Sequence, residues 1–141
     1  MHKRGYRDYT NQAPLNEALA AALVMTSGWD KESTLADYMC GSGTILIEAA
    51  MIMRNIAPNK FKHRFGFQTW KDYDEKLWKS IYNDAIYNEK PAGNIKIYGS
   101  DISGAVIEKA KENIENAGLS DTIIVRKNPF ERFKKPSDTG T

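Results

Sequence analysis

The segment 37–44, which lies directly before an apolar run at 45–53, has residue types and spacing that could bind a ligand. Its residues are Asp37, Tyr38, Met39, Cys40, Gly41, Ser42, Gly43 and Thr44. Glycine lets the backbone approach a ligand closely and adopt positive φ. A following helix would direct its unpaired N–H groups and the positive end of its dipole at this turn. The pattern predicts a nucleotide-cofactor loop, and a strand-to-helix turn without a ligand is the alternative.

Two familiar phosphate-binding loops are excluded by the residues that follow the glycines. A Walker loop requires a Lys-Ser/Thr pair after its last glycine, and the dinucleotide fingerprint requires a third glycine where Leu46 stands. What remains is an acid, Asp37, placed shortly before Gly41. This arrangement suits a ligand with a cationic amino-acid end and an adenosine end, such as S-adenosylmethionine.

A second acid, Asp101, ends the next predicted strand and is expected to accept hydrogen bonds from the ribose hydroxyls of a nucleoside. In dinucleotide-binding folds such an acid lies ~20 residues after the glycine loop. Here an insertion widens that interval. Ile102 is then expected to lie against the adenine ring. The alternative for Asp101 is an N-cap of a helix that starts near Gly104.

Other reactive residue types have simpler explanations. Cys40 could be a nucleophile, but within a glycine loop a small packing residue is the better interpretation. His2 and His63 lack Cys or acid partners at ligand spacing, so we expect no metal site. The tract 61–67 mixes basic and aromatic residues, which could stack on RNA or bury their rings over the core.

The elements that must position these residues alternate between strand and helix. Strands are predicted over 34–39, 95–99 with its end at Asp101, and 122–126. Helices are predicted over 44–55 and over 105–117, the latter capped by Gly118. Such alternation predicts parallel crossovers and a layered α/β sheet.

Two further helices are predicted from apolar spacing. The first begins at Pro14 and is capped by Gly28. Its apolar face is expected to consist of Leu15, Leu19, Ala22 and Leu23. The second lies within an aromatic-rich insertion at 58–93. Its stripe consists of Leu77, Trp78, Ile81, Tyr82, Ala85 and Ile86.

Composition restricts the function classes. With 141 residues and 41% hydrophobic content, the chain can form one core. The single cysteine excludes an internal disulfide. No apolar run approaches the ~18 residues of a membrane span, and no signal-peptide pattern is present, so we expect no membrane partner and a cytoplasmic location. The net charge of +2 is compatible with nucleic acid but too small to indicate it.

The glycine loop resembles the first motif of class I methyltransferases that modify exocyclic amines of nucleic-acid bases. Further segments narrow the resemblance to RNA guanine-N2 methyltransferases, the ribosomal-RNA enzymes and relatives that carry an N-terminal THUMP domain. These segments are 2–7, 13–17, 27–30, 47–50, 54–58 and 65–67 with Trp70. The similarity runs from about residue 2 to residue 127. One departure is Tyr38, where the family usually has proline.

The resemblance implies a Rossmann-like class I fold and the cofactor S-adenosylmethionine, with methyl transfer to N2 of guanine in ribosomal RNA in preference to transfer RNA. The family has an acid that bonds the adenine amino group where this chain has Asn128, whose carbonyl can act likewise. A turn residue is the alternative for Asn128. The segment 128–130 is not the Asn-Pro-Pro-Tyr type of motif that holds the target amine, because it follows the third strand and lacks the second proline.

The domain organisation is therefore expected to be a partial catalytic domain. It comprises an opening helix segment (1–30), the cofactor loop and helix (31–57), the aromatic insertion (58–93), the second and third strands (94–128) and a tail (134–141). With three strands readable, fewer than in the family's sheet, we expect the target-amine motif beyond Thr141, no catalytic residue in this chain, and self-association through an uncovered sheet edge. An adenine-N6 DNA methyltransferase and a non-catalytic cofactor- or RNA-binding module are the alternatives.

Overall fold

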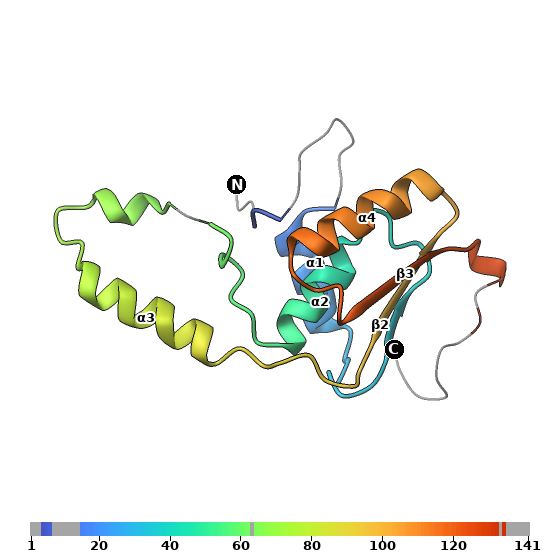
Figure 1. The fold of residues 1–141 in the computed structure, drawn as a ribbon, viewed down its shortest axis with the longest axis horizontal. Helices are drawn as coiled ribbons and strands as arrows, with labels where there is room; N and C mark the ends of the chain where they lie inside the picture. The colour runs from blue at the N-terminus through green and yellow to red at the C-terminus, as the bar shows by residue number, and fades with distance from the viewer. Residues whose placement is uncertain (1–3, 7–14, 63, 133, 135–141) are drawn as a thin grey trace.

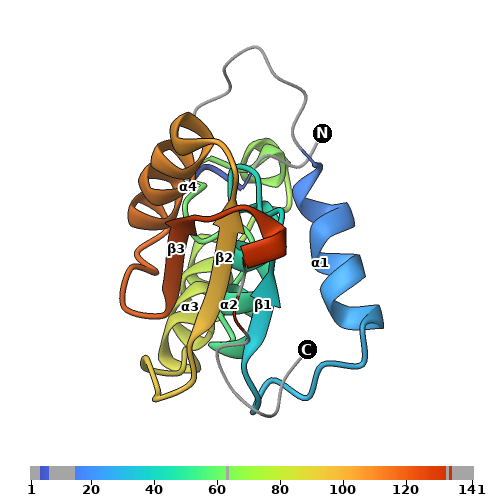
Figure 2. The same cartoon turned by 90° about the vertical axis from the view of Figure 1, so that its right-hand side faces the viewer.

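The computed structural model describes residues 4–6, 15–62, 64–132 and 134, which form a parallel sheet with helices packed against it (Figure 1). The three strands lie in the order β1-β2-β3, and both pairs are parallel. They are β1 (Leu35–Asp37), β2 (Ile97–Asp101) and β3 (Ile123–Lys127). Figure 2 shows them side by side, with β2 in the middle. The expected α/β fold of parallel βα units is confirmed.

The register brings the carboxyl ends of the strands together. Asp37 is level with Gly99 of β2, and Asp101 is level with Lys127 of β3. The loops that follow β1, β2 and β3 therefore leave the sheet at the same edge, which is where open parallel sheets bind their ligands.

The described residues also contain four α-helices and two short 3-10 helices. They are α1 (Glu17–Thr26), α2 (Thr44–Met53), η1 (Gly66–Thr69), α3 (Glu75–Tyr87), α4 (Gly104–Asn116) and η2 (Phe130–Arg132). Helices α2 and α4 pack against the sheet, and α1 packs against α2. Among the described residues, no helix is long and apolar enough to span a bilayer.

Helix α2 is buried almost all round, as its composition predicts, and it approaches the sheet very closely. Leu46 and Ile47 are fully buried. Leu46 lies over Gly99 of β2, where an added Cβ would be 2.4 Å from Leu46 Cδ1. The missing side chain of Gly99 therefore determines the spacing between helix and sheet.

The predicted apolar face of α1 is wrong. Leu19 and Leu23 are 52% and 46% exposed, whereas Ala20 and Val24 are buried. Ala22 is also exposed and Leu15 is partly buried. The helix is apolar on nearly every side, so periodicity could not select a face, and the small Ala20 permits the closer approach to α2. Helix α1 is capped by Asn16, and the predicted first residue, Pro14, lies outside the described residues.

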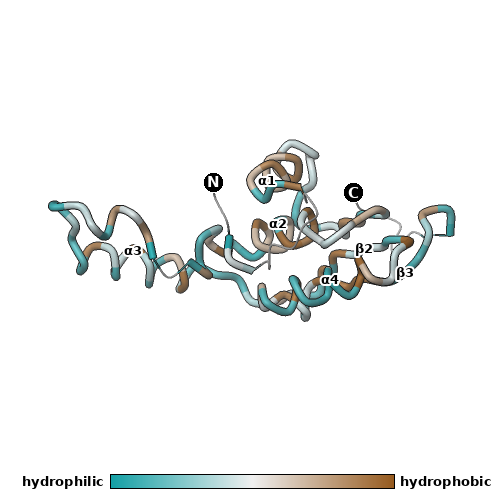
Figure 3. The backbone as a smooth tube through the Cα atoms, turned by 90° about the horizontal axis from the view of Figure 1, so that it is seen from above, coloured by the Kyte–Doolittle hydropathy of each residue, from teal (hydrophilic) through white to brown (hydrophobic). Residues whose placement is uncertain are grey.

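Residues 58–93, here called the arm, project away from the sheet (Figures 1 and 3). The predicted helix is present as α3, but none of its residues is buried, and Leu77 and Ile81 are more than half exposed. Trp78 meets the rings of Phe65 and Phe67 edge-on, with centroids 5.0 and 4.9 Å away. These two rings of the tract 61–67 therefore pack within the arm rather than over the core.

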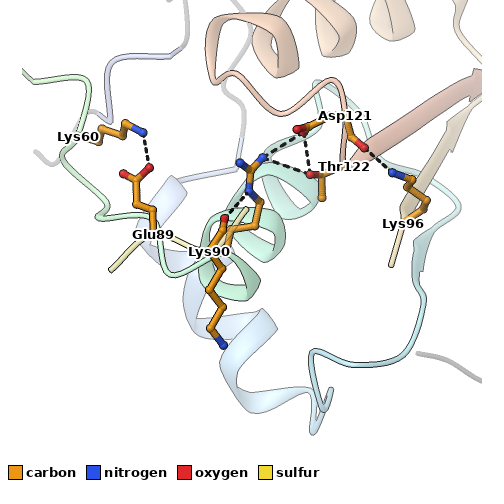
Figure 4. Close-up of polar contacts among 7 residues, drawn as sticks. Lys60, Glu89, Lys90, Lys96, Asp121 and Thr122 are labelled. Atoms are coloured by element: carbon orange, nitrogen blue, oxygen red, sulfur yellow. Dashed lines mark hydrogen bonds and ion pairs between the residues drawn. The ribbon is translucent and has the colours of Figure 1, made fainter. Parts of the chain in front are cut away.

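The arm is fastened where it leaves and rejoins the body (Figure 4). Lys60 forms an ion pair with Glu89, with Nζ 2.6 Å from Oε2. The N–H of Lys90 donates to the carbonyl of Arg54 at 2.7 Å, and Arg54 Nε donates back to the carbonyl of Lys90. Arg54 also donates to Asp121 and Thr122, just before β3.

Candidate functional site

The loop between β1 and α2 has the backbone geometry that its glycines permit. Gly41 has φ of 54° and Gly43 has φ of 82°, both in the left-handed region. Gly43 is the N-cap of α2 and, among the described residues, no side chain caps this helix. The positive end of the α2 dipole therefore lies at this loop.

The carboxylate of Asp101, at the end of β2, accepts a hydrogen bond from the loop between β1 and α2. Its Oδ2 accepts a hydrogen bond from the N–H of Gly41 at 3.2 Å, and its Oδ1 accepts one from the N–H of Ser103 at 2.9 Å. The N-cap of α4 is Ser103, whose side chain accepts from the N–H of Val106. The helix-cap alternative for Asp101 is therefore wrong, and its carboxylate faces the glycine loop.

Asp37 places a second acid at the same edge. Its Oδ1 accepts a hydrogen bond from the N–H of Met39 at 3.0 Å. Burial raises the pKa of Asp37, and the nearby charge of Asp101 raises it further. A carboxylate such as that of Asp37, whose charge is disfavoured by burial and by a neighbouring acid, would be stabilised by a cationic group.

Cys40 lies inside the loop as a buried, protonated thiol. Burial, with the charges of Asp37 and Asp101, raises the pKa of Cys40 to about 12. The thiolate is the nucleophilic form of cysteine, so this residue is unreactive at neutral pH. The packing interpretation of Cys40 is supported, and the nucleophile is not.

The remaining expected site residues surround the two acids. The N–H of Asn128 donates to the carbonyl of Asp101 at 2.9 Å, which brings the segment after β3 beside β2. Met39 and Ile102 are exposed, at 76% and 71%, and offer apolar surface beside the acids. Thr44 is buried at the start of α2. All ten expected residues therefore belong to the segments that leave the carboxyl ends of the three strands.

Sequence reasoning missed a buried acid on α2. Glu48 is 2% exposed and accepts two hydrogen bonds from Arg4, each 3.2 Å long, and one from the hydroxyl of Tyr6. Burial raises the pKa of Glu48, and Arg4 and Tyr6 partly oppose this shift. A lone acid within the apolar run 45–53 was the available signal, because a buried carboxylate requires partners.

It also missed Asn113, which is fully buried on α4 and donates to the carbonyl of Ser42 at 3.0 Å. The signal in the sequence was a polar residue on the apolar face of this helix, next to Ala110 and Ile114.

The backbone of the glycine loop is open at Gly41, beside the two acids. A Cβ added to Gly41 would meet no atom within 4 Å, so the loop backbone is open to a ligand. Two carboxylates lie beside this backbone. That of Asp101 can accept hydrogen bonds from hydroxyl groups, and that of Asp37 can face an ammonium group. Among the described residues, no cluster of His, Cys, Asp and Glu could hold a metal ion.

Known proteins resemble this chain over nearly all of its length. Residues 4–140 match the family described as "RMKL-like, methyltransferase domain". The ribosomal RNA large subunit methyltransferase K/L of Shewanella sediminis (strain HAW-EB3) is 44% identical over 144 residues, which cover 99% of this chain and 20% of that protein. The chain thus spans about a fifth of the length of the curated relatives that it matches.

Two solved structures match with a TM-score of 0.90 each, and each match covers 99% of this chain and 36% of the other. SMU.472, described as a methyltransferase complexed with SAH (S-adenosylhomocysteine), is 36% identical. The other is described as a predicted N6-adenine-specific DNA methylase from Listeria monocytogenes str. 4b F2365 and is 38% identical. The expected methyltransferase fold is confirmed by these similarities.

Proposed function

Because this chain belongs to the RMKL-like methyltransferase domain family, we propose that it is the cofactor-binding part of an enzyme that methylates ribosomal RNA. The methyl donor is S-adenosylmethionine and the acceptor is the exocyclic amine, N2, of a guanine. The observation that carries the proposal is the contact between Asp101 and Gly41 beneath an open backbone surface. Such a contact holds a ribose-binding acid beside a loop that can accept an adenosyl ligand.

Each residue at the carboxyl edge has a role in this proposal. Asp37 faces the ammonium group of the cofactor, and Asp101 accepts hydrogen bonds from the ribose hydroxyls. Ile102 lies against the adenine ring, and the side-chain carbonyl of Asn128 accepts from the adenine amino group. The remaining contacts come from the loop itself: Met39, Cys40, Gly41, Ser42, Gly43 and Thr44.

The cofactor supplies an electrophilic methyl group, and this chain supplies binding and orientation. Holding two reactants in line lowers the barrier by removing their translational and rotational freedom before the reaction. The sequence contains no Asn-Pro-Pro-Tyr motif, and Asn128-Pro129-Phe130 follows β3 and leads into η2. We therefore assign no catalytic residue to this chain, and we expect cofactor binding without methyl transfer.

The substrate assignment rests on the named ribosomal RNA relatives. With it we propose a cytoplasmic location for the enzyme. Adenine-N6 methylation of DNA is the second candidate, because a relative of equal structural similarity is described as a DNA methylase. A non-catalytic cofactor- or RNA-binding module is the third, because the target-amine motif is absent from this sequence.

The uncovered edge of β1 has a consequence for assembly. Within the described residues β1 pairs only with β2, so its outer backbone groups have no strand partner. Unpaired edges invite association. We propose that the 141-residue chain self-associates at high concentration, which analytical ultracentrifugation over a range of concentrations would measure.

The test combines binding and transfer. Calorimetry with S-adenosylhomocysteine should show saturable heat for the 141-residue chain, and absence of binding would contradict the proposal.

Tritium transfer from labelled S-adenosylmethionine should be undetectable for this chain on unmodified ribosomal RNA, transfer RNA and DNA. The full-length Shewanella sediminis relative, run beside it, should label ribosomal RNA. Labelling of DNA instead would favour the second candidate.

A further inference from the structure

Asn113 is a polar residue on the buried face of α4. It has no exposed surface, and its neighbours on that face, Ile107, Ala110 and Ile114, are apolar and buried. Its Nδ2 donates to the carbonyl of Ser42 at 3.0 Å, across 71 positions of the chain. A side chain of the βα unit that follows β2 thus holds the glycine loop that follows β1.

The other polar atom of the same side chain, Asn113 Oδ1, is not satisfied by any described residue. Within the described part of the chain, Asn113 Oδ1 is buried and has no hydrogen-bond partner. An unpaired buried acceptor lowers the free energy of unfolding by at least as much as a single neutral hydrogen bond raises it. Leucine has the same number of side-chain heavy atoms and would suit the apolar face. Stability alone therefore does not account for asparagine here, and residues that break a packing rule are expected at functional sites.

The loop needs such a constraint because glycines flank Ser42. Gly41 and Gly43 both have positive φ, and glycine backbones lose the most freedom when they are fixed. Asp101 holds the N–H of Gly41 on one side of the loop, and Asn113 holds the carbonyl of Ser42 on the other. Ala110 lies directly beneath Gly43, with its Cβ 3.5 Å from where a glycine Cβ would stand.

The consequence reaches the start of α2. The peptide unit between Ser42 and Gly43 is planar, so a fixed Ser42 carbonyl also fixes the direction of the Gly43 N–H. Gly43 is the N-cap of α2. The N–H of Gly43 itself donates to the carbonyl of Cys40 at 2.9 Å, so this peptide unit is held at both its carbonyl and its N–H. Asn113 thus helps to fix the turn from which α2 begins.

We propose that Asn113 is a positioning residue that pre-organises the cofactor loop from α4 without contacting the cofactor. The inference rests on the proposed cofactor site. A loop already held in its binding conformation loses less freedom when a ligand binds, so its affinity is higher.

The test replaces Asn113 with leucine and uses Ile114→Val as the matched control. Asn113→Leu removes both the hydrogen bond and the unpaired oxygen, so its melting temperature should equal or exceed that of the wild type. Its affinity for S-adenosylhomocysteine should fall about tenfold, the loss expected for one tether of this kind. Ile114→Val, which trims the same buried face, should lower the melting temperature and leave the affinity unchanged.

A second readout needs no ligand. In the free protein, the amides of Gly41 and Gly43 should exchange with solvent faster in Asn113→Leu than in the wild type, as measured by NMR. If Asn113→Leu does not fold, Asn113→Ala takes its place in both measurements.

The two measurements separate a failure of the proposed function from a failure of the positioning role of Asn113. If the wild type does not bind S-adenosylhomocysteine, the proposed function fails, and amide exchange still decides the role of Asn113. Unchanged exchange at both glycines overturns the positioning role. A loss of affinity that only parallels a loss of stability, as in an ordinary core variant, also overturns it.

Discussion

The carboxylate of Asp101 accepts a hydrogen bond from the backbone N–H of Gly41, across 60 positions of the chain and 3.2 Å of space. This contact joins the end of β2 to the turn that follows β1. The acid and the loop are thus held in place relative to each other by a contact within the chain itself. Pre-arranged polar groups of this kind bind with less loss of freedom than groups that must be assembled.

Asp101→Ala should weaken the binding of S-adenosylhomocysteine about tenfold or more. A hydrogen bond to a charged group contributes ~1.5–3 kcal/mol, and ~1.4 kcal/mol is a factor of ten in affinity. Calorimetry would measure the change, with Asp84→Ala, an exposed acid on α3, as the control. Equal affinity in the wild type and Asp101→Ala would contradict the ribose assignment.

Asp37→Asn should raise stability at neutral pH and weaken cofactor binding. Since burial and Asp101 raise the pKa of Asp37 above its ordinary 3.8, the folded chain binds this proton more tightly than the unfolded chain. Ionising Asp37 therefore destabilises the fold, and stability falls as pH rises from about 3.8 through the raised pKa.

Asparagine keeps the acceptor for the Met39 N–H and removes the charge. Urea denaturation of both proteins at pH 4 and pH 7 would measure the effect. The stability gain of Asp37→Asn should be larger at pH 7, and a gain that is equal at the two values would show that the charge is not its source.

Asn128→Ala should weaken cofactor binding, because it removes the side-chain carbonyl assigned to adenine, and it should leave RNA affinity unchanged. Among the described contacts, the backbone N–H of Asn128 holds the segment beside β2, and alanine keeps this N–H. S-inosylhomocysteine, which has oxygen in place of the adenine amino group, sharpens the test. The wild type should prefer S-adenosylhomocysteine over this analogue, and Asn128→Ala should bind both alike. An equal preference in the two proteins would remove Asn128 from the adenine site.

Cys40 should resist alkylation in the folded protein at pH 8, because its pKa is about 12 and its side chain is buried. Reaction with a thiol reagent should become fast only in urea. Cys40→Ala should retain cofactor affinity within about twofold, as expected for loss of a small packing group. Rapid labelling of the native chain would show that the thiol is activated.

Gly99→Ala should destabilise the fold by roughly 1–3 kcal/mol or more, because its Cβ would stand 2.4 Å from Leu46 Cδ1 and 3.1 Å from Cys40 Sγ. Gly93→Ala is the matched control, since a Cβ there meets nothing within 4 Å. Thermal unfolding would measure both. Leu46→Val, which shortens the opposing side chain, should restore part of the loss in the double variant.

The strands, the helices and the convergence of Asp37, Asp101 and Asn128 were predictable from the sequence. Their signals are local: short β-rich runs, a glycine turn, and acids placed where strands end. Because parallel strands share one carboxyl edge, the sequence order alone brings these residues together.

The errors and omissions have a different origin. The buried face of α1 could not be read from a helix that is apolar on nearly every side, so Leu19 and Leu23 were assigned to the wrong environment. The partners of Glu48 and Asn113 lie 44 and 71 positions away, and no periodicity links such distant positions. Packing between elements, rather than local preference, decides these contacts.

Because hydrogen bonds join Arg54 to Lys90 at the base of the arm, the length of the arm does not affect how the strands pair. Near the two ends of the arm, the N–H of Lys90 donates to the carbonyl of Arg54, and the side chain of Arg54 donates to the carbonyl of Lys90. These bonds keep the two ends adjacent whatever lies between them. Each doubling of a closed loop adds only about 0.6 kcal/mol of closure entropy. We therefore expect that shortening or lengthening the arm between Lys60 and Glu89 would leave Asp101 and the glycine loop in the same relative position.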